Sequence, residues 1–250
     1  MVPFCEPLQR ETMYSAAPPT PHAERLVTLL TLIAGNERAA HEIAFALDGE
    51  RGTEMALEQC PADLLRDALG HAVSRADGRS VLPGPQRLAL VLARATKLGD
   101  ARAAELAGLS AEAFRREIEA AEEALSAVPN RRAVVLEDHL LARETLVDQA
   151  AVAGLEVIAA TGNGRAAVAA AAAFAPAIAL VDLTLDGAEL AGDLGAMQIR
   201  EVAPDCHVMF VTGYPDAPRI ASLMQNASAL LKPVGQEQLS AAVRAALPHL

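Results

Sequence analysis

The sequence predicts a protein of two fold classes, in which an all-α domain precedes an α/β domain that contains a five-stranded parallel sheet. Up to about residue 126, apolar residues recur at helical spacing. After a short linker at 126–130, the pattern changes to short apolar strands that alternate with helical stretches. Hydrophobic residues make up 52% of the chain, so both domains can bury a core.

The first domain is expected to span residues 21–128, after a flexible leader at 1–20 that contains four prolines. Its N-terminal part, 21–76, begins with an apolar helix that stops at Gly35. Asn36 can then cap a second helix, whose apolar residues lie on one face.

The remainder of this domain, 82–126, predicts three further helices. Gly108 lies in the turn between the last two of them, and Ser110 is placed to cap the last one. These helices are expected at 86–97, 100–107 and 111–126.

The second domain, 131–250, predicts a parallel sheet with helices on both faces, because strands and helices alternate along it. The strands are expected at 133–136, 156–160, 178–181, 208–211 and 229–231. Four of these five strands end on polar residues, and those ends meet in space if the strand order is 2-1-3-4-5. The residues are Glu137 and Asp138 after the first strand, Asp182 after the third, Thr212 at the fourth and Lys232 after the fifth.

This group of side chains suits phosphate chemistry with a hard cation. Three carboxylates gathered at one place repel each other unless they take up protons or bind a metal, and carboxylate oxygens are ligands that Mg²⁺ prefers. A lysine and a hydroxyl opposite them can hold a phosphoryl group. Asp182 ends an apolar strand that looks fully buried. Its charge is tolerated there if Mg²⁺ and Lys232 neutralise it, and it is then placed to act as a nucleophile.

At these motifs, residues 131–250 resemble the receiver domain of two-component response regulators, which has a flavodoxin-like fold. The matching stretches are AVVLEDHL, ALVDLTL, MFVTGYP and ALLKP. The resemblance implies that Asp182 accepts a phosphoryl group from a kinase phosphohistidine. It also implies that Glu137, Asp138, Asp182 and the backbone carbonyl of Thr184 hold Mg²⁺, while Thr212 and Lys232 bind phosphoryl oxygens. A receiver that kept the fold and lost the chemistry is the alternative, which the presence of all five side chains disfavours.

One position departs from the common receiver pattern. Most receivers carry an aromatic residue two positions before the lysine, where this chain has Leu230. Tyr214 instead follows the threonine, which resembles the receiver subgroup with a Phe-Ala-Thr-Gly-x-Tyr signature; an ordinary loop aromatic is the alternative. The stretch Thr161–Arg165 contains a lone Gly-x-Gly, which indicates a tight turn rather than a nucleotide site.

The helical part at 82–125 resembles region 4 of extracytoplasmic-function sigma factors. The resemblance rests on the Leu-Pro at its start, the Ala-Ala-x-x-Ala-Gly-Leu-Ser turn at 103–110 and the apolar residues Phe114 and Ile118 after the turn. This is a helix-turn-helix layout. Its last helix has five glutamates against two arginines, so DNA contacts are not expected. Residues 21–76 then correspond to region 2, or else form a generic helical bundle.

A sigma-like domain ahead of a receiver resembles the PhyR-type general stress response regulators. That resemblance implies partner switching: phosphorylation frees the sigma-like domain to capture a small anti-sigma factor of the NepR type, which releases the true sigma factor. The implied phosphodonor is a sensor histidine kinase or phosphotransferase. The alternatives are a phosphorylation-controlled DNA-binding regulator that uses 100–126, and an enzyme for a small phosphorylated substrate. The enzyme is disfavoured because no further acid–base groups are evident near Asp182.

Charge and composition exclude several other classes. The net charge is −11 and acidic residues outnumber basic ones in both halves, unlike a nucleic-acid binder. The three cysteines, Cys5, Cys60 and Cys206, have no paired or metal-type spacing, which fits a reducing compartment. Neither a signal peptide nor a membrane span is evident, so a cytoplasmic protein is expected.

Overall fold

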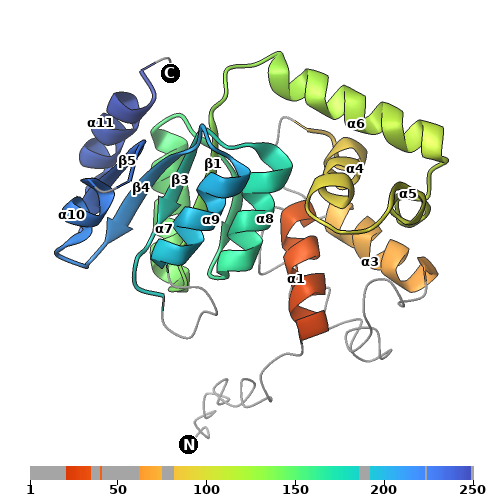
Figure 1. The fold of residues 1–250 in the computed structure, drawn as a ribbon, viewed down its shortest axis with the longest axis horizontal. Coiled ribbons are helices and arrows are strands. Elements are labelled where there is room, and N and C mark those ends of the chain that lie inside the picture. The colour runs from red at the N-terminus through yellow and green to blue at the C-terminus, as the bar shows by residue number, and fades with distance from the viewer. Residues whose placement is uncertain are drawn as a thin grey trace, which may run out of the picture.

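A computed structural model describes residues 21–34, 40, 62–74, 82–185, 192–222 and 224–248 (Figure 1). The predicted leader at 1–20, the cap at Asn36 and most of the helix after it lie outside the described residues. Within the described part, a helical region precedes a sheet that is covered by helices on both faces.

The helical region confirms the all-α prediction for the first part of the chain. Its helices are α1 (Pro21–Ala34), α3 (Ala62–Ser74), α4 (Gly84–Arg94), α5 (Asp100–Ala107) and α6 (Ala111–Ser126). The last two have the predicted bounds, whereas α4 begins two residues before the predicted 86–97 and ends three residues before it. Pro85 explains the early start. The first N–H groups of a helix have no partner within the helix, so proline, which has no N–H, is well tolerated at these positions.

The turn between α5 and α6 is built as its residues predict. Gly108 ends α5 with a φ of 69°, a left-handed conformation that glycine adopts at little cost. The next residue, Leu109, donates its N–H to the carbonyl of Ala104 at 2.9 Å. The Ser110 hydroxyl then accepts the N–H of Ala113 at 3.2 Å and caps α6. The predicted roles of Gly108 and Ser110 are both confirmed.

The sheet has five parallel strands in the order β2-β1-β3-β4-β5, as predicted. The strands are β1 (Arg132–Leu136), β2 (Glu156–Thr161), β3 (Ile178–Val181), β4 (His207–Thr212) and β5 (Ala227–Leu231). The helices that follow them are α7 (Leu140–Val152), α8 (Gly164–Phe174), α9 (Gly192–Val202), α10 (Ala217–Ser222) and α11 (Gln236–Ala246). The central strands β1, β3 and β4 are wholly buried, as strands covered on both faces are.

Two apolar cores lie on the two faces of this sheet. One includes Leu146 of α7 and Leu239 of α11. The other includes residues of α8, α9 and α10, and it continues without a break into the helical region through residues such as Ile33 and Leu90. Helices α1 and α4 contact α8, and α1 also contacts β2.

Helix α8 is therefore covered by the sheet on one side and by the helical region on the other (Figure 1). This position explains its composition, GRAAVAAAAAF. Small alanine side chains allow neighbours to approach on both sides, and a helix that is apolar nearly all round is typical of a buried position. Among its residues, only Arg165 is exposed.

In the part of the chain that the structure describes, no helix combines the length and the hydropathy needed to cross a membrane.

Candidate functional site at the carboxyl edge of the sheet

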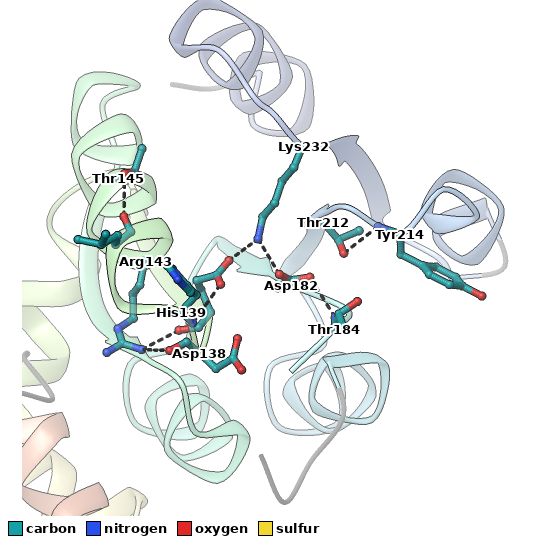
Figure 2. Close-up of polar contacts among 11 residues, drawn as sticks. Asp138, His139, Arg143, Thr145, Asp182, Thr184, Thr212, Tyr214 and Lys232 are labelled. Atoms are coloured by element: carbon teal, nitrogen blue, oxygen red, sulfur yellow. Dashed lines mark hydrogen bonds and ion pairs between the residues drawn. The ribbon is translucent and has the colours of Figure 1, made fainter. Parts of the chain in front are cut away.

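Asp182 lies immediately after β3, at the centre of the carboxyl edge of the sheet (Figure 2). Its N–H donates to the carbonyl of Leu136 at 2.8 Å, which fixes its backbone beside the end of β1. Its carboxylate accepts the N–H of Thr184 at 3.0 Å through Oδ1 and the ammonium of Lys232 at 2.6 Å through Oδ2. The residue is 6% exposed. The strand thus delivers a nearly buried carboxylate that is held by hydrogen bonds on both oxygens.

Lys232 joins three strand ends. Its N–H donates to the carbonyl of Thr212 at 2.8 Å, which continues the pairing of β5 with β4. Its side chain then crosses the edge, and Nζ lies 2.5 Å from Oε2 of Glu137 as well as 2.6 Å from Asp182. Glu137 is 1% exposed. Burying this carboxylate without a partner would be costly, so the ammonium is part of what allows the two acids to lie together.

Both members of the Asp182–Lys232 pair have shifted pKa values. Burial alone raises the pKa of Asp182, but hydrogen bonds from Lys232, Thr184 and Thr212, with the charge of Lys232, outweigh it and leave the pKa below its ordinary value. Burial alone lowers the pKa of Lys232, but its hydrogen bonds and charge interactions with Asp182 and Glu137 leave it raised. Asp182 is therefore ionised and Lys232 protonated across the neutral pH range.

The other predicted site residues surround this pair. Thr212 is fully buried, and its hydroxyl accepts the N–H of Tyr214 at 3.3 Å. Thr184 is exposed beside Asp182. Asp138 follows Glu137 and is half-buried. Figure 2 shows its side chain below the ammonium group of Lys232. The strand ends thus bring Glu137, Asp182, Thr212 and Lys232 together, with Asp138 and Thr184 at the rim.

Comparison with known proteins agrees with this geometry. Residues 133–244 match the family model of the response regulator receiver domain. This part of the chain is a receiver domain. The parallel order β2-β1-β3-β4-β5 and the acidic, hydroxyl and lysine groups at its carboxyl edge agree with that assignment, and the predicted resemblance is confirmed.

Solved structures are similar over longer or shorter parts of the chain. The anti-anti-sigma factor PhyR from Bartonella quintana is 17% identical, with 92% of this chain and 94% of that chain covered and a TM-score of 0.42. The receiver domain of a modulated diguanylate cyclase from Desulfovibrio desulfuricans G20 is 29% identical, with 47% and 94% covered and a TM-score of 0.42. NtrX from Brucella abortus in complex with ADP is 22% identical, with 47% and 27% covered and a TM-score of 0.42. No curated protein matches the chain significantly.

The donor chemistry of the receiver site fits a divalent cation. Glu137 and Asp182 each direct an oxygen to the same nitrogen, Nζ of Lys232, so both can reach a single positive charge at this edge. Among the described residues, no three acidic, histidine or cysteine side chains are already grouped as a metal site. The carboxylates of Glu137 and Asp182 thus point to the same place. That Asp138 and the Thr184 carbonyl also bind the cation stays a prediction.

Tyr214 and Leu230 show how the receiver differs from the common pattern. The Tyr214 side chain is 45% exposed and points away from Asp182 in Figure 2. Its backbone N–H, rather than its ring, contacts Thr212. Leu230 lies half-buried in β5 and packs against the core on the α7 and α11 face.

The stretch Thr161–Arg165 is a strand-to-helix turn, as predicted. The Asn163 side chain accepts the N–H of Ala166 at 3.1 Å and caps α8, and the Asn163 N–H donates to the Thr161 hydroxyl at 3.0 Å. Its polar groups are therefore used within the turn, which agrees with a structural role for the Gly-x-Gly rather than a nucleotide site.

At the site and at the interface between the helical region and the receiver, four arginines that bind backbone carbonyls were not predicted. Arg143 of α7 donates to the carbonyls of Glu137 and Asp138, at 2.7 and 3.3 Å. The others, Arg87, Arg94 and Arg132, lie where the helical region meets the receiver. None of the four follows from a sequence pattern, because their acceptors are main-chain carbonyls, which every residue carries.

The interface arginines bind β2 and the carbonyl end of α8, which we define as the carbonyls of residues 173–175. Arg87 of α4 is 3% exposed, donates to the carbonyls of Leu32 and Ile158 at 2.8 and 2.5 Å, and lies 4.8 Å above the ring of Phe174. At the carbonyl end of α8, Arg94 donates to Ala173 at 3.3 Å, Arg132 to Phe174 at 2.9 Å and Asn130 to Ala175 at 3.0 Å. Arg132 also donates to the carbonyl of Leu125 in α6 at 3.2 Å.

Proposed function

We propose that this protein is a PhyR-type response regulator, a phosphorylation-gated anti-anti-sigma factor. Asp182 receives a phosphoryl group from a sensor histidine kinase or phosphotransferase, and the helical region then captures a small anti-sigma factor. The observation that carries the proposal is the convergence of Glu137, Asp182 and Lys232 at the carboxyl edge of the receiver sheet, in a chain whose N-terminal helical region packs on α8 of the same receiver.

The phosphoryl transfer needs a nucleophile, charge neutralisation and alignment. An oxygen of the Asp182 carboxylate forms a bond to phosphorus while the phosphorus–nitrogen bond of the donor phosphohistidine breaks, and the electron pair stays on the histidine nitrogen. The low pKa of Asp182 keeps the nucleophile ionised. Lys232 and Thr212 lie within hydrogen-bond reach of Asp182, where they bind the phosphoryl oxygens.

Mg²⁺ is the cofactor that the acidic group supports. Glu137, Asp138, Asp182 and the Thr184 carbonyl are the groups that would hold it. When bound, it offsets the negative charge that builds up between the carboxylates and the phosphoryl oxygens. Catalysis by the protein is limited to its own phosphorylation and dephosphorylation, so we do not propose an enzyme for a separate substrate.

The gating part of the proposal rests on the packing against α8. Helices α1 and α4 bury apolar residues, including Leu32, Ile33 and Val91, in the core that they share with α8. Release of the helical region would expose part of that surface. An apolar groove between helices is suited to an amphipathic helix of a partner, so the same surface can serve either α8 or the anti-sigma factor. Phosphorylation favours the released state through its different interaction free energies with the two states.

The proposal is tested by labelling and capture with the full-length protein. With Mg²⁺ and a small phosphodonor, the wild type should gain one phosphoryl group on Asp182 and then bind a NepR-type anti-sigma factor from the same genome. Asp182→Asn should lose both properties, while Asp193→Asn, which changes an exposed carboxylate of α9, should keep both. Capture by Asp182→Asn without a donor, at the level of the labelled wild type, would contradict phosphorylation gating.

DNA binding is the second candidate, because α5, the Gly108 turn and α6 form a helix-turn-helix arrangement. The outer surface of α6 opposes it. Its exposed residues include Glu112, Glu119, Glu122 and Glu123. Glu112 and Glu122 also pair with Arg116 and Arg94, which further removes cations from phosphate contact. We expect no salt-dependent gel shift with promoter DNA; a specific shift would favour this candidate.

A further inference from the structure

The acidic loop, which we define as residues 137–139, is held by a side chain from the helix that follows it. Arg143 lies in the first turn of α7, and its N–H donates to the carbonyl of His139 at 2.9 Å. Its Nη1 reaches back to the carbonyls of Glu137 and Asp138, at 2.7 and 3.3 Å (Figure 2). One guanidinium nitrogen thus holds two consecutive peptide groups.

These two carbonyls lie where the strand can no longer bind them. The Glu137 N–H still pairs with the carbonyl of Thr161, at 3.0 Å, but β1 itself ends at Leu136. Backbone acceptors in a half-buried loop need partners from elsewhere. Because Arg143 supplies them, it fixes the planes of two peptides, and those planes set the directions in which the Glu137 and Asp138 side chains leave the backbone.

The other side of the acidic loop is closed by Gly162, in the turn before α8. A Cβ at this position would lie 2.9 Å from the Asp138 Cα and 3.1 Å from Nη1 of Arg143. Any residue other than glycine would therefore push against the loop backbone. The loop is enclosed between the guanidinium and this turn, which leaves little freedom for Asp138.

We propose that Arg143 is a positioning residue for the divalent cation of the receiver site, an inference that rests on the proposed function. Arg143 acts through the backbone of Glu137 and Asp138 and touches neither the cation nor the phosphoryl group. Groups that orient metal ligands in this way commonly change metal affinity by about 10- to 100-fold when they are removed.

The positive charge of Arg143 repels a cation and weakens its binding, whereas positioning of the ligands strengthens it. The two effects can therefore be separated by substitution. If only charge mattered, Arg143→Met would bind Mg²⁺ more tightly and Arg143→Lys would bind it as the wild type does. If the position of Nη1 between the two carbonyls matters, both variants bind Mg²⁺ more weakly, because the shorter side chain of lysine does not place an N–H group where Nη1 lies.

The test is an isothermal titration of the full-length protein with Mg²⁺ alone. We expect Kd to rise by about 10-fold in Arg143→Met and Arg143→Lys. Gly162→Ala keeps the arginine but presses on the Asp138 backbone and on Nη1 of Arg143, and we expect weaker Mg²⁺ binding there too. Arg219→Met is the matched control, since it removes an exposed positive charge on α10 and should leave Kd unchanged. The rise in Tm on adding Mg²⁺ should be smaller in Arg143→Met, Arg143→Lys and Gly162→Ala than in the wild type and Arg219→Met. A variant that had only lost stability would start from a lower Tm but show the same rise.

These results distinguish failure of the positioning role of Arg143 from failure of the proposed function. Wild-type affinity in Arg143→Lys, or tighter binding in Arg143→Met, overturns the positioning role and leaves the proposed function intact. Failure of the wild type to bind Mg²⁺ overturns the proposed function, and the positioning role with it.

Discussion

Two regions of this molecule bury cationic side chains, and they give those side chains different kinds of partner. At the carboxyl edge of the sheet, Lys232 lies between two ionised carboxylates. At the interface with the helical region, Arg87 of α4 donates to the carbonyl of Ile158 and Arg132 of β1 donates to the carbonyl of Leu125 in α6, and these acceptors are neutral. The first arrangement depends on charge, so protonation of a carboxylate, or the proposed phosphorylation of Asp182, would change it. The second depends on the positions of main-chain groups.

This difference constrains how a signal can pass between the two regions. A phosphoryl group on Asp182 adds charge at the sheet edge, but carbonyl acceptors at the interface do not titrate. We therefore expect the proposed signal to act by displacing β2 or α8, whose carbonyls these arginines bind. Three hydrogen bonds connect the site with α8: the Glu137 N–H donates to the Thr161 carbonyl, the Asn163 N–H donates to the Thr161 hydroxyl, and the Ala166 N–H in the first turn of α8 donates to the Asn163 side chain. We take this as a hypothesis for the route, since contact alone does not demonstrate coupling.

The largest expected effect comes from removing the cation at the sheet edge. Lys232→Met leaves Glu137 and Asp182 facing each other without compensation. We expect a loss of about 3 kcal/mol in the free energy of unfolding, at the lower end for breaking a buried pair, because Lys232 is 29% exposed. Urea unfolding without Mg²⁺ measures it. The other lysine of the chain, Lys97, is exposed, and Lys97→Met should leave the free energy of unfolding unchanged. Equal stability of the two variants would mean that the charges at the edge are not coupled.

Arg87→Met should produce the next largest effect. The variant removes the donor to Leu32 and Ile158 and also the guanidinium that lies over the Phe174 ring. We expect a loss of about 2 kcal/mol, because buried acceptors lose their partner. Arg115→Met on the exposed face of α6 is the control. Wild-type stability by urea unfolding would show that these carbonyl contacts do not hold the interface.

Acidification should affect the sheet edge and leave the carbonyl contacts unchanged. The pKa of Asp182 is lowered from its ordinary 3.8, so the stability that it contributes is present above that value and is lost as the pH falls through the lowered one. Urea midpoints between about pH 5 and pH 2 should therefore fall more for the wild type than for Asp182→Asn. Parallel curves for the two proteins would contradict the assigned pKa shift.

The smallest expected effect is at the exposed margin of the interface. Arg94 pairs with Glu122 and reaches the carbonyl of Ala173 at 3.3 Å, and both side chains of the pair are more than one third exposed. We expect Arg94→Gln to cost about 0.5 kcal/mol, as exposed pairs do. A loss of stability as large as that of Arg87→Met would contradict this ranking and show that Arg94 contributes as much to the interface as Arg87.

The same contrast explains what the sequence could predict. Residues at strand ends, such as Asp182 and Lys232, were predictable because parallel strands bring their carboxyl ends to one edge. The turn at Gly108 and Ser110 was predictable because these residue types have specific backbone roles. Arg87 and Arg143 were not, because each binds a carbonyl, which every residue carries. The packing of α8 between the sheet and the helical region was not predicted either, because it depends on contacts between elements that are far apart in the sequence.

The central claim is that phosphorylation of Asp182 separates the helical region from α8, and hydrogen exchange tests it most directly. Amide exchange would be followed in α4 and α8, with Mg²⁺ and with or without a small phosphodonor, in the wild type and in Asp182→Asn. The account predicts faster exchange in both helices of the labelled wild type and no change in the variant. Full labelling of Asp182 with unchanged exchange in α4 and α8 would contradict it.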